Sequence, residues 1–154
     1  MLLALALLVL TPAAQARSRS QTPVERQVVE ALNEVRARHG LGALRVAPGL
    51  VQAARSHSRD MLLRDYFSHP SLGGPDFGDR VRRHHPAPVV GENLAWGTGR
   101  LRAPAAVVRM WMDSPPHRAI ILDREFRVVG VGRSFGTFRG HRRAAVFTAD
   151  FASR

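Results

Sequence analysis

Histidine and carboxylate side chains provide most of the chemistry open to this chain of 154 residues, which contains neither cysteine nor lysine. The missing thiols exclude a disulfide-stabilised fold, a thiolate metal site and a cysteine nucleophile. The missing amines exclude Schiff-base chemistry and a P-loop lysine. The motifs H-E-x-x-H and G-x-G-x-x-G do not occur either. Local motifs alone therefore predict no more than a basic globular domain.

Four histidines have ordinary structural explanations. His57 lies on the inner stripe of a predicted helix, which favours a hydrogen-bonded, partly buried side chain over a metal ligand. His84 and His85 fall in an arginine-rich loop and are expected to be solvated. His39 lies near a helix C-terminus, where positive charge is favourable.

The formal net charge is +11, from 23 basic residues, all of them arginine, and 12 acidic ones. One interpretation is a solvated surface that aids solubility. The alternative is adhesion to an anionic partner, such as cell-wall polymer, phospholipid headgroups or extracellular nucleic acid. Aromatic residues do not interleave with the arginines, so no specific nucleic-acid site is expected. The residues concerned form three clusters: Arg80, Arg82 and Arg83; Arg100 and Arg102; Arg139, Arg142 and Arg143.

Helices are predicted first along the chain and strands last. Thr22, Pro23 and Glu25 form a capping box. Apolar spacing predicts helices over residues 23–39, 48–65 and 104–113, and a long loop over 67–88 with one helical turn at 77–83. Alternation predicts strands at 127–135 and 142–151, joined by a hairpin connection at 136–140. This order indicates an α+β fold rather than a doubly wound sheet.

The N-terminal residues have the composition of an export signal. An apolar run from Leu2 to Leu10 precedes Ala14-Gln15-Ala16, an A-x-A cleavage site. The run is too short to span a bilayer as a helix. We therefore expect a signal peptide at 1–16, a short polar leader at 17–21 and one domain at 22–154. The mature protein is expected to be secreted or held in the cell envelope. No transmembrane segment is expected in the mature chain.

Three short segments, followed by a glycine-rich strand, resemble a known family. They are Y-F-S-H-P at 66–70, G-E-N-L-A-W at 91–96 and W-M-D-S-P-P-H-R at 111–118, followed by V-G-V-G at 129–132. Their order is similar to that of the CAP superfamily, the sperm-coating-protein-like or SCP domain, and in particular to its short exported bacterial branch. The resemblance covers most of the mature chain. It implies an α-β-α sandwich with a small antiparallel sheet between helical layers.

The resemblance also implies a cleft lined by two histidines and, usually, two acidic residues. His69 and His117 match the histidines, and Glu92 matches the acidic residue of G-E-N. Ser114 occupies the second acidic position, so this chain departs from the family pattern there. Asn93 and Trp96 are further candidates for the cleft wall.

These residues permit more than one chemistry. His69 and His117 can hold a divalent metal, with Zn²⁺ completed by water as the first expectation and Glu92 as a third ligand or as an orienting group. Alternatively, Glu92 accepts hydrogen bonds that only hold loops together. Ser114 beside His117 could be a nucleophile, but its place before Pro115 equally fits a helix cap.

Three functions remain open at this point. The chain could be a secreted binding module for a lipid or envelope-derived ligand, which we favour because no clear nucleophile or complete metal shell is present. It could be a weak metal-dependent hydrolase using His69, Glu92 and His117. It could also be a cell-surface interaction protein that acts through its arginine-rich loops.

Overall fold

The computed structural model describes residues 21–154. The predicted signal peptide and the leader up to residue 20 lie outside the described residues. The elements run in the order α2 (Pro23–Arg38), β1 (Arg45–Val46), α3 (Pro48–Leu63), α4 (Phe77–His84), β2 (Val90–Gly97), the short 3₁₀ helix η1 (Gly99–Arg102), α5 (Pro104–Asp113), α6 (Pro115–Leu122), β3 (Val128–Phe138) and β4 (His141–Ala152).

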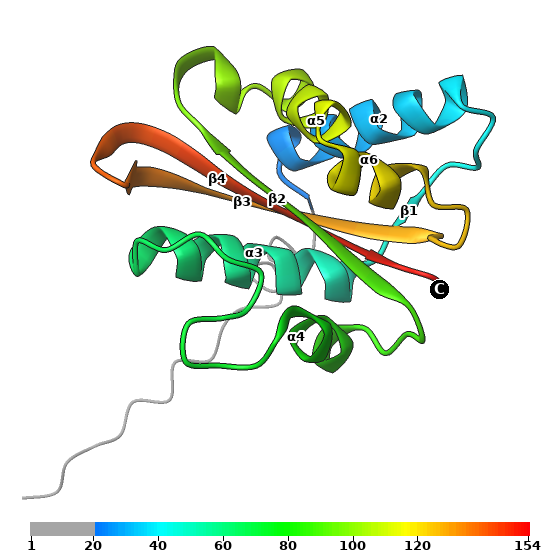
Figure 1. Cartoon of the computed structure of the whole chain (residues 1–154), viewed down its shortest axis with the longest axis horizontal. Coiled ribbons are helices and arrows are strands. Elements are labelled where there is room, and N and C mark those ends of the chain that lie inside the picture. Colours follow the sequence, from blue (N-terminus) through cyan, green and yellow to red (C-terminus); the bar gives the residue numbers. More distant parts are fainter. Residues whose placement is uncertain (1–20) are drawn as a thin grey trace, which may run out of the picture.

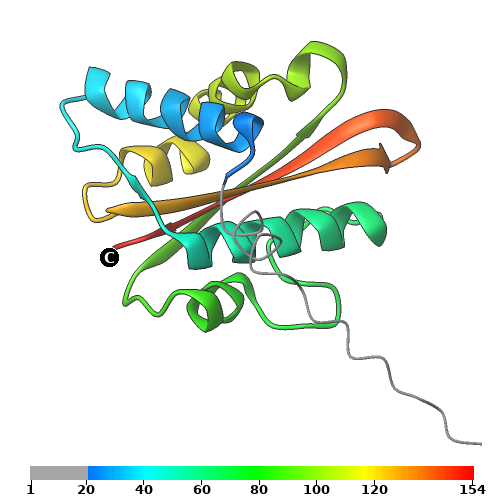
Figure 2. The same cartoon turned by 180° about the vertical axis from the view of Figure 1, so that it is seen from behind.

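A four-stranded sheet forms the middle of three layers (Figure 1). The strand order is β1-β3-β4-β2; β3 pairs antiparallel with β4, β4 pairs antiparallel with β2, and β1 pairs parallel with β3. Helices α2, α5 and α6 cover one face, while α3 and α4 cover the other, as the reverse view in Figure 2 also shows. The predicted α+β class and the α-β-α sandwich are confirmed, and β2 is an edge strand that both helical layers can reach.

Proline begins four of the helices. Pro23, Pro48, Pro104 and Pro115 occupy the first turn of α2, α3, α5 and α6, where the missing N–H has no helical partner to lose. The predicted capping box is present: the Thr22 hydroxyl accepts from the Glu25 N–H at 3.3 Å, and Glu25 accepts from the Thr22 N–H at 2.7 Å. The helices predicted at 23–39, 48–65 and 104–113 are therefore confirmed to within two residues.

The sequence did not predict α6 and β2, the two unpredicted elements that carry site residues. Pro115 and Pro116 do end α5, but Pro115 also opens α6, and Ser114 lies between the two helices as a shared cap position. β2 contains glycine, glutamate and asparagine, which have low intrinsic strand propensity. It is a strand because it pairs with β4 along its whole length, from Val90 opposite Ala152 to Gly97 opposite Ala145.

The β3–β4 hairpin is tighter than predicted. Phe138 pairs directly with His141, so the connection is Arg139-Gly140 rather than 136–140. Both turn residues have positive φ, 48° and 77°, as a two-residue turn with the twist of the strands requires. Residues 136–138 therefore extend β3 instead of forming a loop.

Helix α3 lies unusually close to β3. A Cβ placed on Gly130 would come within 2.1 Å of the Leu50 carbonyl carbon, and one on Gly132 within 2.2 Å of the Ala54 carbonyl carbon. Only glycine leaves room for helix backbone at this distance. The V-G-V-G segment thus brings α3 onto the sheet and buries the face on which part of the candidate site lies.

Candidate functional site

Glu92 projects from edge strand β2 and is the centre of a buried polar cluster. Its Oε1 accepts a hydrogen bond from His69 Nδ1 at 2.7 Å, and its Oε2 is paired with the Arg80 guanidinium. Because an ionised carboxylate only accepts, His69 must carry its proton on Nδ1, which leaves Nε2 available to a ligand. The Glu92 side chain is fully buried, whereas the His69 side chain is 46% exposed.

Arg80 is not the solvated surface residue that the charge pattern suggested. It comes from α4 and is only 7% exposed. Besides its ion pair with Glu92, it donates to the His69 carbonyl oxygen at 2.8 Å. The same guanidinium therefore holds the backbone of the His69 loop and neutralises the carboxylate to which that histidine is bonded.

Asn93 holds the second histidine segment from the opposite face of β2. Successive strand residues point to opposite faces, so Asn93 lies on the side of α6, where its Nδ2 donates to the His117 carbonyl oxygen at 3.0 Å. Next to them, Gly91 lies under Phe126, whose Cζ would be 2.8 Å from an added Cβ. The three residues of G-E-N thus connect His69, His117 and the α6–β3 loop through one edge strand.

His117 is half-buried, and its Nδ1 has no hydrogen-bond partner among residues 21–154. Burial, and to a lesser extent the nearby His69, lower the pKa of His117. Both effects keep the imidazole neutral, the form that a metal requires. The two histidines could therefore supply nitrogen ligands, and Glu92, with both oxygens already bonded, fits an orienting role. Within residues 21–154 no group of three or more His, Asp or Glu side chains is arranged to hold a metal.

Asp150 belongs to the cluster, although the sequence did not identify it. It lies opposite Glu92 on β4 and is completely buried. As a carboxylate it would have no partner for either oxygen among the described residues. Burial and the charge of Glu92 raise the pKa of Asp150 well above its usual value, which favours the protonated acid beside Glu92. An acid between the apolar residues Ala149 and Phe151 was the available signal.

His57 completes the buried side of the cluster. Its Nε2 bonds to the Ser68 carbonyl oxygen at 2.9 Å, and it is 1% exposed. Desolvation lowers the pKa of His57, so the ring is neutral at neutral pH. This histidine fixes the residue before His69 and has the structural role that its position on the helix predicted.

A mainly apolar groove of about 560 Å³ runs beside the His69–Glu92 pair. Its walls come from the α4 side, from β2 and from the α6 side, and include Phe77, Val90, Ile120 and Phe126. Polar atoms are confined to His69, Glu92, Asp123 and the backbone. The volume is in the range of small-molecule sites.

The remaining candidates lie apart from this groove. Trp96 is on the same face of β2 as Glu92 but packs against Phe138 and His141, with ring centroids 5.4 and 5.5 Å away. Ser114 is half-buried at the junction of α5 and α6, and its hydroxyl makes no capping bond. Neither residue lines the groove, and His117 is not part of its lining either. Asn93 contributes through the His117 backbone rather than as a wall.

The sequence profile of the cysteine-rich secretory protein family, CAP, matches residues 29–151. The chain belongs to the CAP family. It is 36% identical over 120 residues to the uncharacterized protein YkwD of Bacillus subtilis, a match that covers 73% of this chain and 43% of that protein. It is 34% identical over 113 residues to the uncharacterized membrane protein YlbC of the same species, covering 73% and 32%. The chain thus spans less than half the length of these CAP relatives.

Solved structures share the CAP fold with this chain. An extracellular protein with an SCP domain from Bacillus anthracis superimposes with a TM-score of 0.73 at 27% identity, covering 95% of this chain and 45% of that one. An outer surface protein of Borrelia burgdorferi gives a TM-score of 0.71 at 18% identity, covering 88% and 98%. Within residues 21–154, no helix is long and apolar enough to cross a membrane.

Proposed function

We propose that this CAP-family chain is an exported binding module that takes up a lipid or another apolar, envelope-derived molecule. The groove along β2 carries the proposal, because apolar walls and a few polar groups at one side are the usual features of a ligand site. Phe77, Val90 and Phe126 would contact the apolar part of the ligand. His69, half-exposed and fixed by Glu92, would contact its polar end.

Export is part of the same proposal. The apolar N-terminal run with its A-x-A site supports it. The similar Bacillus anthracis protein is described as extracellular, and the Borrelia protein as an outer surface protein. A binding module outside the cytoplasm would meet lipids of the envelope directly.

Filling the groove tests the proposal. Ala119 is exposed on α6 and lines the groove, so Ala119→Trp should occupy the space needed by a ligand. We expect this variant to lose binding of a fluorescent long-chain fatty acid, measured by titration, while its circular dichroism and melting temperature stay unchanged. The matched control is Ala105→Trp, an equally exposed alanine on α5 outside this groove.

The two variants separate the possible outcomes. Loss of binding with Ala119→Trp alone supports the β2 groove. Loss with Ala105→Trp alone would place the probe between α2 and α5, and absence of binding by the unmodified chain would remove the lipid proposal altogether.

Metal binding is a second candidate, favoured by the unpartnered Nδ1 of His117. His69 and His117 would hold a Zn²⁺ ion, and Glu92 would orient His69. When bound, the ion would act as a Lewis acid beside His69. The hydrolase alternative is weaker because Glu92 is already bonded to both Arg80 and His69 and is not a free base.

Titration calorimetry with Zn²⁺ tests this candidate. His69→Ala and His117→Ala should each abolish binding, whereas His84→Ala, an exposed histidine outside the cluster, should bind as the unmodified chain does. Affinity should fall as pH decreases through the histidine range, near about 6.5, because protons compete for the nitrogens. Equal binding by all three variants would contradict the site, and unfolding of His69→Ala would indicate a purely structural cluster.

A further inference from the structure

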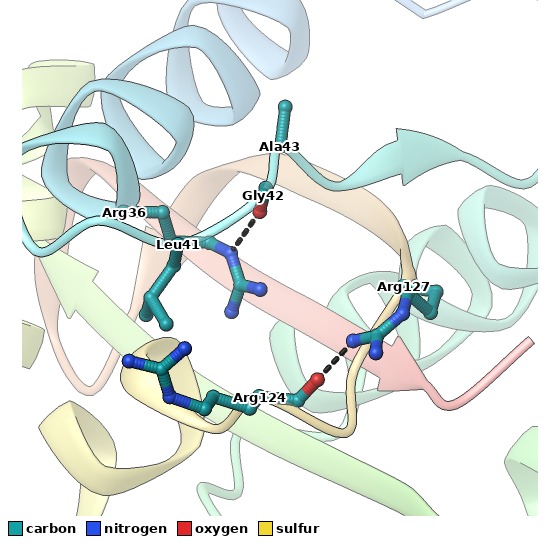
Figure 3. A pocket seen from close by; sticks show the side chains of 6 residues that line it. All are labelled: Arg36, Leu41, Gly42, Ala43, Arg124 and Arg127. Carbon is teal, nitrogen blue, oxygen red and sulfur yellow. Dashed lines mark hydrogen bonds between the residues drawn. The ribbon is translucent and has the colours of Figure 1, made fainter.

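Three arginines surround a second hollow, outside the groove along β2 (Figure 3). It has a volume of about 390 Å³ and is lined by Arg36, Arg124 and Arg127 together with the turn Leu41-Gly42-Ala43. Figure 3 shows the guanidinium group of Arg36 between those of the other two arginines. No acidic side chain is part of the lining.

Arg36 forms the inner wall and is 2% exposed. It comes from α2, and among the described residues its guanidinium donates to four backbone carbonyl oxygens: Gly42 at 2.9 Å, Ile121 at 2.8 Å, Asp123 at 2.9 Å and Phe126 at 3.3 Å. A guanidinium has five N–H groups. Four are occupied here, so one remains for a ligand.

The positive charge of this pocket is not neutralised by an ion pair. Within residues 21–154, none of the four ion pairs includes Arg36, Arg124 or Arg127. Burial, and next the charge of Arg127, lower the pKa of Arg36, while the carboxylate of Asp123 acts in the opposite direction. That carboxylate accepts the Glu125 N–H at 2.7 Å. The positive charges of Arg36 and Arg127 repel each other, and an anion bound between them would relieve this repulsion.

We propose that this pocket binds the phosphate group of a phosphate monoester or of free phosphate. Guanidinium groups match phosphate oxygens with paired N–H donors. Arg36 is held rigidly by the backbone, whereas Arg124 and Arg127 are exposed on the α6–β3 loop. Arg127 donates through Nη1 to the Arg124 and Phe126 carbonyl oxygens, which leaves its Nε and Nη2 groups for a bound anion. Three cations favour a dianion over a singly charged carboxylate.

The pocket is separate from the proposed lipid site, although one loop serves both. Asp123 and Phe126 line the groove along β2, whereas Arg124 and Arg127 line the arginine pocket. Phosphate binding therefore stands independently of the proposed function. A variant of the two outer arginines leaves the groove lining unchanged.

Calorimetric titration of the full chain with inorganic phosphate tests the proposal, with chloride at equal ionic strength as the reference. The double variant Arg124→Gln/Arg127→Gln should weaken phosphate binding by at least about tenfold. The matched control Arg118→Gln/Arg142→Gln removes the same charge from exposed positions outside the pocket and should change affinity little. Both variants should melt as the unmodified chain does, because all four arginines are exposed.

Two results would overturn the proposal: no phosphate binding beyond the chloride reference, or an equal loss in both double variants, which would indicate general attraction to a basic protein. A parallel titration with glycerophosphate distinguishes the sources. Equal affinities assign the pocket to the phosphate group alone, and tighter glycerophosphate binding assigns it to a phosphate monoester.

Discussion

At the scale of single residues, Glu92 organises the polar interior beside the groove. It bonds to His69 on one oxygen and to Arg80 on the other, and Asp150 lies opposite it on β4. A buried carboxylate requires such partners, because desolvation without them is costly. The arrangement leaves one ion pair, one neutral acid and one neutral imidazole, His57, in the same interior.

The protonated state of Asp150 makes stability depend on pH. The pKa of Asp150 is raised in the folded state above the unfolded value of about 3.9. The contribution of Asp150 to the free energy of unfolding is therefore complete below pH about 3.9 and is lost as pH rises through the folded-state pKa. Asp150→Asn keeps a donor toward Glu92 without this loss. We expect Asp150→Asn to raise the melting temperature at neutral pH and to have a smaller effect near pH 4 in thermal melts.

Asp113→Asn is the control, since Asp113 is exposed on α5 and should show no such trend. His57 and His117 act with the opposite sign, because their lowered pKa values remove stability as pH falls below about 6.5. A stability gain from Asp150→Asn that grows on acidification would contradict the protonated assignment.

At the scale of elements, the close contact between α3 and β3 determines which face of the sheet is buried beneath α3. Gly130 and Gly132 touch helix backbone, which cannot yield as a side chain can. Ser58 on α3 adds polar contacts across the same interface: its hydroxyl donates to the Gly132 carbonyl oxygen at 3.1 Å and, having one proton, accepts from the Thr148 hydroxyl at 2.9 Å. This helix therefore covers the face that carries Glu92 and Asp150.

Gly132→Ala should be strongly destabilising. The added Cβ would lie 2.2 Å from the Ala54 carbonyl carbon, so helix and strand must separate, at a cost of roughly 2 kcal/mol or more. The matched control is Gly136→Ala on the same strand, where the nearest atom is Leu62 Cδ2 at 3.2 Å, the end of a flexible side chain. Urea unfolding measures both, and equal free energies of unfolding would contradict the close-contact explanation.

At the scale of the whole molecule, the apolar groove along β2 and the arginine pocket lie on either side of one loop. The α6–β3 loop separates the apolar groove from the arginine pocket. Several other arginines lie on the outside, and a formal net charge of +11 favours contact with anionic material through long-range attraction. The charge thus fits a protein that works at a cell envelope, the setting that the proposed function requires.

Export is the prediction that belongs to this scale. Cleavage after Ala16 should give a mature N-terminus at Arg17, because A-x-A precedes that bond. N-terminal sequencing of protein recovered from the culture medium or the envelope measures this directly. Ala16→Leu should block processing, since the site accepts small residues only, and secreted protein that still begins at Met1 would contradict the assignment.

The sequence by itself determined the fold class, the starts of α2, α3 and α5, and the family. Prolines, the capping box and apolar periodicity act over a few residues, so α2, α3 and α5 could be predicted without tertiary information. The segments containing His69, Glu92 and His117 could be recognised because their order resembles a family pattern. Their chemistry stayed open, since the segments are distant in sequence.

Only the tertiary structure decided which side chains meet. β2 is a strand because β4 pairs with it, against its own low propensity. Arg80 and Asp150 looked like an ordinary surface charge and an unremarkable strand residue until α3 and α4 buried the second face of the sheet. Likewise, Arg36 and Arg127 meet because α2 packs against the loop before β3. Contacts between distant segments depend on packing of whole layers, which local sequence patterns do not encode.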